Sequence, residues 1–226
     1  LHIACLALNL KKGDVVWTVP NTFAATANCA LNCGAKVDFV DIDKNTWNMC
    51  VQSLETKLQK EKNKLPKIVI PVHFAGQATD QKKIWELSKK FKFKIIEDAS
   101  HSLGAKHFTE PVGSCKWSDI TVFSFHPVKA LTTGEGGIVT TNSKYLNDKI
   151  KTDIRSNLSP RHIPDQVIRV DSIPKTLNGK KLEIPVKKIL SGTPVNEALN
   201  IESVSNPDSL KLFVKFSKNQ ANRTDV

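Results

Sequence analysis

The feature that most constrains the fold is an alternation of helix-like and strand-like runs over residues 1 to about 145. Apolar residues at helical spacing predict helices, and short apolar runs rich in Val, Ile and Phe predict strands. Expected helices span residues 1–10, 22–32, 51–62 and 80–91, and expected strands span residues 15–19, 36–42, 67–74, 93–97, 120–125 and 137–141. This alternation favours an α/β fold, with a mainly parallel sheet between helices.

The pattern changes after about residue 145. From there on we expect helices and a single short strand, over residues 146–158, 166–170, 184–190 and 209–216. The composition changes too, because residues 1–150 contain no Arg and the remainder contains four, while all five Cys lie in the first part. We therefore predict two domains, residues 1–145 and a small α+β tail over residues 146–226.

Composition narrows the class of protein. Hydrophobic residues are 40% and charged residues 24% of the 226, as in globular chains. No apolar run reaches the ~18–20 residues of a membrane-spanning helix, so we expect no membrane partner. The net charge of +11 is spread along the chain without interleaved aromatic residues, so we expect no nucleic-acid partner. The cysteines match no zinc spacing and predict buried thiols in a cytoplasmic protein.

Residues with chemical potential lie where predicted strands end, the edge at which parallel sheets bind ligands. Asp98 comes directly after one predicted strand, Ser124 and Lys129 lie at and beyond the end of another, and Phe23 lies at the start of a helix. An amine, a carboxylate, a hydroxyl and an aromatic ring can bind the aldehyde, pyridine nitrogen, phosphate and ring face of pyridoxal phosphate. Taken singly, these residues are better explained without a cofactor: Lys129 as a solvated surface lysine and Asp98 as a helix cap.

The order of five segments is more specific than any one residue. They are PNTF at 20–23, VDFVDID at 37–43, PVHFAGQ at 71–77, EDASH at 97–101 and FSFHPVK followed by GEGG within 123–137. Together they resemble the DegT/DnrJ/EryC1/StrS family of sugar aminotransferases, over residues 1–145. Within that family the similarity is greatest to the enzymes of pseudaminic acid biosynthesis.

The resemblance implies a large domain of the fold-type I class of pyridoxal-phosphate enzymes. It also implies transfer of an amino group from glutamate to a UDP-linked 4-keto-6-deoxy-N-acetylhexosamine. By resemblance, Lys129 forms the imine with the cofactor and shuttles the proton, Asp98 pairs with the pyridine nitrogen, Phe23 stacks on the ring, and Ser124 contacts the phosphate. Two further residues are implied near the cofactor ring, namely Gln77 and His101.

The family pattern also has parts without a counterpart in this sequence. They are a Gly-Thr-Ala helix start that holds the phosphate and a small C-terminal domain that completes the site across a homodimer interface. We therefore expect an incomplete catalytic site in this chain, although the family itself implies a homodimer.

The tail resembles a different family. The segments SPRH at 159–162 and PKTLNGKK at 174–181 are similar to the C-terminal end of acyl-CoA synthetases, above all acetoacetyl-CoA synthetases. By that resemblance Lys180 is a catalytic lysine that neutralises charge at the ATP phosphate. For this chain we favour a solvated lysine on a surface turn, because the large nucleotide- and acyl-binding domain of a synthetase has no counterpart in the sequence. Two alternatives to the aminotransferase therefore stay open, a ligase fragment and a non-catalytic remnant of two joined genes or of sequence assembly.

Overall fold

A computed structural model describes residues 1–61, 64–157 and 172–221 of the chain. The chain divides into two compact units, Leu1–Ile163 and Pro164–Val226. Each unit has hydrophobic clusters of its own. Over the described ranges, no helix is long and apolar enough to cross a membrane.

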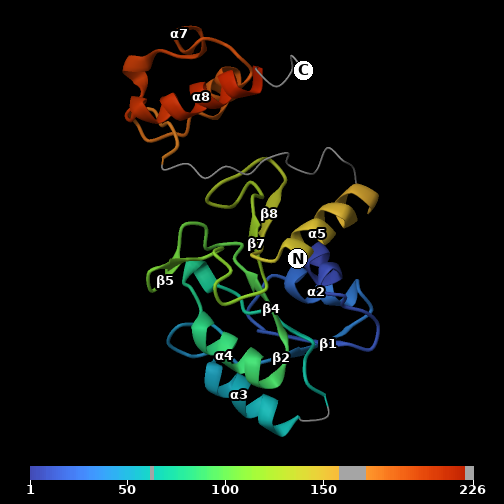
Figure 1. Cartoon of the computed structure of the whole chain (residues 1–226). Coiled ribbons are helices and arrows are strands. Elements are labelled where there is room, and N and C mark those ends of the chain that lie inside the picture. The colour runs from blue at the N-terminus through green and yellow to red at the C-terminus, as the bar shows by residue number, and fades with distance from the viewer. Residues whose placement is uncertain (62–63, 158–171, 222–226) are drawn as a thin grey trace. The chain divides into compact units, whose positions relative to one another are not determined.

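Six strands form the central sheet of the first unit (Figure 1), in the order β2-β1-β3-β4-β7-β8. Their bounds are β1 Val15–Thr18, β2 Lys36–Phe39, β3 Ile68–Val69, β4 Lys94–Asp98, β7 Ile120–Ser124 and β8 Gly137–Thr140. The first four neighbouring pairs are parallel, and β8 runs antiparallel to β7. The predicted α/β fold with a mainly parallel sheet is confirmed.

Helices cover both faces of this sheet (Figure 1). One face packs against α1 (His2–Ala7), α2 (Ala25–Leu31) and α5 (Lys144–Asn157). The other face packs against α3 (Val51–Lys60) and α4 (Gln81–Phe91). Successive side chains of a strand point to opposite faces. Ile96 accordingly joins the first cluster and Ile95 the second.

Helix α5 belongs structurally to the first unit. Leu146 and Ile150 are both 7% exposed within the core shared with α1 and α2. Lys149 Nζ donates to the carbonyl oxygens of Leu6 and Ala7, at 3.2 and 3.1 Å, where α1 ends. The division between the units therefore falls after residue 163, later than the boundary of 145/146 that the sequence led us to expect.

Several elements differ from the sequence-based expectation. The strand expected over 67–74 is only Ile68–Val69, because Pro71 has no N–H and interrupts the ladder. A single parallel bridge between Val72 and Asp98 follows, and then a 3-10 turn, η1 (Phe74–Gly76). The helix expected over 22–32 begins at Ala25. A two-stranded hairpin of β5 (Lys106–His107) and β6 (Glu110–Pro111) was not expected.

The second unit is small and mainly helical. Its elements are α6 Glu183–Leu190, α7 Val195–Ala198, η3 Ile201–Ser203, η4 Pro207–Ser209 and α8 Leu210–Ala221. Ile189, Val204 and Leu210 form its core. The two helices expected in this part are confirmed as α6 and α8. The expected strand over 166–170 and the segment 159–162 lie outside the described residues.

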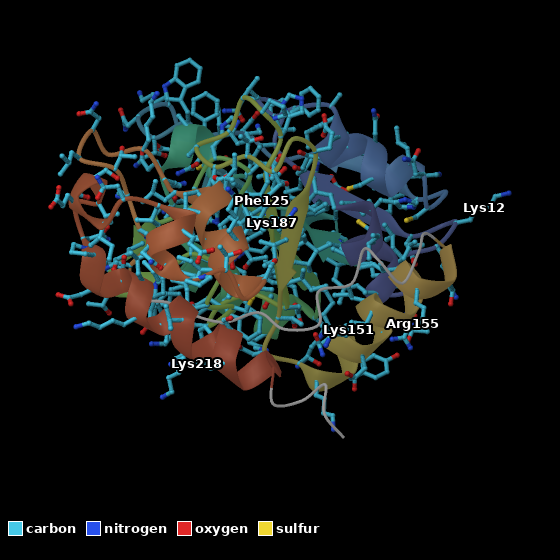
Figure 2. All side chains as sticks on the ribbon, turned by 90° about the horizontal axis from the view of Figure 1, so that it is seen from above. Lys12, Phe125, Lys151, Arg155, Lys187 and Lys218 are labelled. Atoms are coloured by element: carbon cyan, nitrogen blue, oxygen red, sulfur yellow. The ribbon has the colours of Figure 1, made fainter. Side chains whose placement is uncertain are left out.

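The surplus of cations is distributed over exposed positions. Lys12 in the first unit, Lys151 and Arg155 on α5, and Lys187 and Lys218 in the second unit are all exposed (labelled in Figure 2). Such side chains keep their charge in water while their stems cover neighbouring surface.

Candidate active site

Four parallel strands, β1, β3, β4 and β7, end at the same edge of the sheet. Six of the predicted site residues follow or end these strands, one or two per strand: Phe23 after β1, Gln77 after β3, Asp98 and His101 at and after β4, and Ser124 and Lys129 at and after β7. The fold thus gathers at one edge residues that are up to 106 positions apart, counted from Phe23 to Lys129.

Asp98 is held by hydroxyl groups on both of its carboxylate oxygens. It is the last residue of β4, and it is only 4% exposed. Thr26 Oγ1 donates to Oδ2 at 2.7 Å, and Ser100 Oγ donates to Oδ1 at 2.6 Å. Thr22 Oγ1 lies 2.8 Å from Thr26 Oγ1. Because Thr26 donates its single hydroxyl proton to Asp98, Thr22 is the donor in the contact between the two threonines.

Lys129 contacts His101 directly. Lys129 Nζ lies 2.8 Å from His101 Nε2, and Lys129 is half-buried in the turn after β7. The turn that follows β3 approaches the same histidine, since a Cβ added to Gly76 would lie 2.9 Å from the His101 carbonyl oxygen. Gly76 has a φ of +90°, a conformation that favours glycine. The turns after β3, β4 and β7 therefore meet around His101.

The remaining predicted residues line the same edge without joining that contact. Phe23 is 81% exposed, and Gln77 is also exposed. Ser124 is half-buried, and its Oγ accepts a hydrogen bond from the backbone N–H of His126 at 3.4 Å. Over the part of the chain that the structure describes, no hydrogen bond links these three side chains to Asp98, His101 or Lys129.

Lys180, the other predicted catalytic residue, belongs to the second unit. It is exposed and lies on a tight turn in which Thr176 N–H donates to the Lys180 carbonyl at 2.7 Å. Gly179 has a φ of +79°, which closes the turn. Lys180 thus follows no strand of the central sheet.

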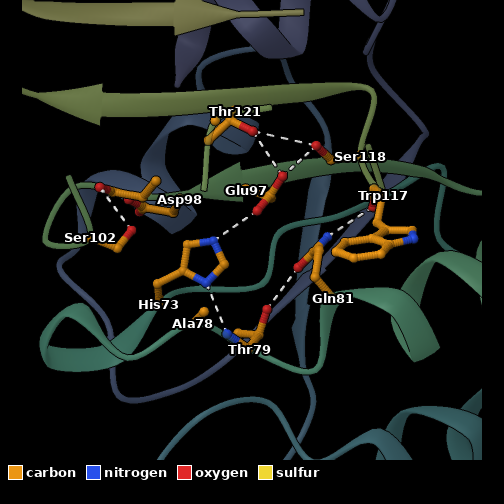
Figure 3. Close-up of polar contacts among 12 residues, drawn as sticks. His73, Ala78, Thr79, Gln81, Glu97, Asp98, Ser102, Trp117, Ser118 and Thr121 are labelled. Carbon is orange, nitrogen blue, oxygen red and sulfur yellow. Dashed lines mark hydrogen bonds and ion pairs between the residues drawn. The ribbon is translucent and has the colours of Figure 1, made fainter. Parts of the chain in front are cut away.

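A buried polar network lies on the opposite face of the sheet from Asp98 (Figure 3). Glu97 is 4% exposed, and its Oε2 lies 2.9 Å from His73 Nε2. Its Oε1 accepts from Thr121 Oγ1 at 2.8 Å and also from Ser118 Oγ. His73 Nδ1 accepts from Thr79 N–H at 3.0 Å, so Nε2 is the ring nitrogen that donates to Glu97.

This network has an electrostatic consequence for Glu97. Burial acts to raise the pKa of its carboxyl, but the hydrogen bond from His73 and the two hydroxyl donors outweigh burial, so the pKa lies below its usual value. The network also reaches the site edge through the backbone, because His73 N–H donates to the Asp98 carbonyl at 3.1 Å.

Thr26, Ser100 and His73 make contacts that sequence reasoning did not foresee, although Ser100 and His73 lie within the segments EDASH and PVHFAGQ. One signal was available for Thr26, since Thr22 and Thr26 are four apart and therefore fall on one side of a helical turn. The pairing of Thr26 with Asp98 spans 72 residues and required the fold.

The fold and this edge of the sheet define the large domain of an aminotransferase. A structure of an aminotransferase from Brucella abortus superposes with a TM-score of 0.64 at 30% sequence identity, covering 75% of this chain and 45% of that one. The chain belongs to the DegT/DnrJ/EryC1/StrS aminotransferase family, whose model matches residues 1–162. The family resemblance stated from the sequence is confirmed.

Two further relatives bear on chemistry. The chain is 48% identical over 151 residues to UDP-4-amino-4,6-dideoxy-N-acetyl-beta-L-altrosamine transaminase from Campylobacter jejuni, covering 67% of this chain and 39% of that protein. The chain thus spans about two fifths of the length of that relative. NtdA from Bacillus subtilis, solved with bound cofactor PMP, superposes with a TM-score of 0.60 at 28% identity, covering 74% of this chain and 37% of that one. The family uses pyridoxal phosphate.

Proposed function

We propose that this chain carries part of the cofactor site of a pyridoxal-phosphate aminotransferase of nucleotide-sugar biosynthesis. The observation that carries the proposal is the placement of the buried Asp98 and the Lys129–His101 pair after neighbouring parallel strands. The substrate we propose is a UDP-linked 4-keto-6-deoxy-N-acetylhexosamine, with glutamate as the amino donor. Identity of 48% with the Campylobacter jejuni transaminase supports that choice.

The residues present fit the cofactor by their chemistry. The buried carboxylate of Asp98, with each oxygen oriented by a hydroxyl, can accept a hydrogen bond from a pyridinium N–H. The half-buried amine of Lys129, in contact with the His101 imidazole, can react with an aldehyde carbon. A strand-end hydroxyl matches a phosphate oxygen, and an aromatic side chain that is 81% exposed leaves its face free for stacking.

Each residue then has a proposed task. When bound, the cofactor supplies an electron sink and a carrier for the amino group. Lys129 would hold it covalently and carry a proton on Nζ, and His101 accepts a hydrogen bond from that amine. Asp98 would hold the pyridine nitrogen, Phe23 would cover the ring, and Ser124 would bind the phosphate. One further polar side chain is proposed at the cofactor's edge, that of Gln77.

The test is a labelling experiment on the full chain. Purified protein is mixed with pyridoxal phosphate, reduced with borohydride and digested, and the modified peptides are mapped by mass spectrometry. We expect the label on Lys129, with loss of that label in Lys129→Ala and a strong reduction in Asp98→Ala. Lys180→Ala is the matched control, and we expect it to label at Lys129 like the unaltered chain.

Label scattered over surface lysines, with no preference for Lys129, would contradict the cofactor site. The chain would then be a non-catalytic remnant of the family. A Lys180→Ala variant that lost the Lys129 label would also contradict the proposal, because the proposal gives Lys180 no role in holding the cofactor.

For the second unit, we propose a relationship to the C-terminal end of acyl-CoA synthetases. The glycine-closed turn at 176–180, which presents the exposed Lys180, supports it, since a lysine on such a turn can reach a separate nucleotide site. Adenylation of acetoacetate, assayed with ATP and coenzyme A, would favour a ligase fragment over the aminotransferase.

A further inference from the structure

We infer that Thr26 is a positioning residue that fixes Asp98 against the ring nitrogen of the cofactor. The inference rests on the proposed function and deepens it. Thr26 is completely buried at the start of α2, and it donates to Asp98 Oδ2 at 2.7 Å. No motif of the sequence identified it, and its side chain faces another protein group rather than the open edge of the sheet.

The hydrogen bonds around Asp98 leave its carboxylate one orientation. Thr26 holds Oδ2, and Ser100 holds Oδ1 through both its hydroxyl and its N–H, at 2.6 and 3.2 Å. Rotation of the carboxylate would break contacts on both oxygens at once. With its single hydroxyl proton donated to Asp98, Thr26 Oγ1 accepts the hydrogen bond from Thr22 Oγ1.

Thr26 also ties Asp98 to Phe23. Its backbone N–H donates to the Phe23 carbonyl at 3.0 Å, while its hydroxyl binds Asp98. Phe23 and Asp98 are the two residues proposed to contact the face and the nitrogen of the same cofactor ring. A single buried residue therefore sets the spacing between them, and this is a task that a hydroxyl donor can perform and a methyl group cannot.

The experiment compares Thr26→Val, which keeps the volume and removes the donor, with Thr26→Ser, which keeps the donor. Two probes are titrated into each variant of the 226-residue chain: pyridoxal phosphate, and an analogue with carbon in place of the ring nitrogen. Dissociation constants come from absorbance, and the borohydride label on Lys129 is quantified in parallel. We expect Thr26→Val to weaken pyridoxal phosphate binding roughly tenfold, the loss of one hydrogen bond to a charged group, with recovery in Thr26→Ser.

The nitrogen-free analogue separates positioning from folding. It offers Asp98 no ring nitrogen, so Thr26→Val and the unaltered chain should bind it equally. Equal weakening of both probes by Thr26→Val would overturn the inference and assign Thr26 a purely structural role. Unchanged binding of pyridoxal phosphate would overturn it as well.

A second variant covers the case in which Thr26→Val does not fold. Ser100→Ala removes the donor to the other oxygen of Asp98, and Ser100 is only half-buried. We expect the same selective loss toward pyridoxal phosphate, and equal loss toward both probes would overturn the inference. Failure of the unaltered chain to label at Lys129 would reject the proposed function and this inference together. Normal labelling of the unaltered chain, with no effect of Thr26→Val on pyridoxal phosphate binding, would reject the inference alone.

Discussion

At the scale of single residues, two adjacent carboxylates have different surroundings because they point to opposite faces of β4. Asp98 faces α2 and meets Thr26, and Glu97 faces the other way and meets His73. Both are 4% exposed. Strand alternation alone thus separates a carboxylate available at the site edge from one committed to the protein interior.

The pH dependence of stability should report on Glu97. The pKa of Glu97 in the folded chain lies below its ordinary value of about 4.5. The network therefore makes its full contribution to the stability of the fold at pH values above 4.5. The contribution is lost as the pH falls from there through the folded-state pKa. We expect Glu97→Gln to lower the free energy of unfolding by roughly 1–3 kcal/mol at neutral pH and to flatten its decline in acid. Urea unfolding at several pH values measures both.

The control for this prediction is Glu86→Gln on α4, where the carboxylate is exposed. That variant should keep the acid decline of the unaltered chain. A Glu97→Gln variant with an undiminished acid decline would contradict the role given to the network.

Some residues of the site could be predicted from the sequence, and others could not. Asp98, Ser124 and Lys129 stand out because each ends or follows a strand-like run in an ordered set of segments. Thr26 lies in none of those segments, and His73 lies in one of them, but their partners are 72 and 24 positions away and only the sheet order brings each pair together. Their roles depend on long-range geometry, which no local pattern contains.

At the scale of elements, strongly periodic segments were predicted closely. Helix α4 was expected over 80–91 and is Gln81–Phe91, since Ile84 and Leu87 lie on one face and lysines on the other. The hairpin of β5 and β6 was missed because each strand has two residues, too few to show alternation. Strand β3 was overestimated because apolar residues continue past Pro71, although only a single bridge, between Val72 and Asp98, forms there.

The close approach of two strand-end turns yields a prediction at this scale. Gly76→Ala should destabilise the fold by roughly 1–2 kcal/mol through its positive φ, and further through contact with the His101 carbonyl, which the new Cβ would meet at 2.9 Å. It should also weaken cofactor binding, because the contact displaces His101. Chemical unfolding and pyridoxal phosphate titration provide the two measurements.

Gly104→Ala is the matched comparison. Gly104 has a similar φ of +86° but nothing within 4 Å of an added Cβ, so it carries the backbone strain without the contact. Gly76→Ala should therefore be the more destabilising of the two. Equal effects would mean that the turns can separate without consequence.

At the scale of the whole molecule, the chain combines two units with separate cores. The domain boundary at 145/146 stays a prediction. Helix α5 lies beyond it and is rich in lysine, which resembles an exposed helix in the sequence, yet Leu146 and Ile150 pack into the core of the first unit.

Truncation distinguishes the two boundaries. A chain ending at residue 163 should retain the cooperative unfolding of the first unit, since all members of its clusters are present. A chain ending at residue 145 loses Leu146 and Ile150, and each large-to-small loss in a core costs roughly 2–5 kcal/mol. We expect it to unfold at a clearly lower urea concentration by circular dichroism. Equal midpoints for the two chains would show that α5 is dispensable.

The carboxylates of Glu97 and Asp98, which point to opposite faces of β4, also restrict which insertions and deletions this strand can accept. Deleting or inserting one codon within 94–98 would exchange the two faces, turning the interior glutamate toward α2 and the aspartate toward α4. A two-codon change restores the faces but shifts every contact by about 6.6 Å along the strand. Changes of length are therefore expected to accumulate in the loops between strands, while β4 keeps its five residues.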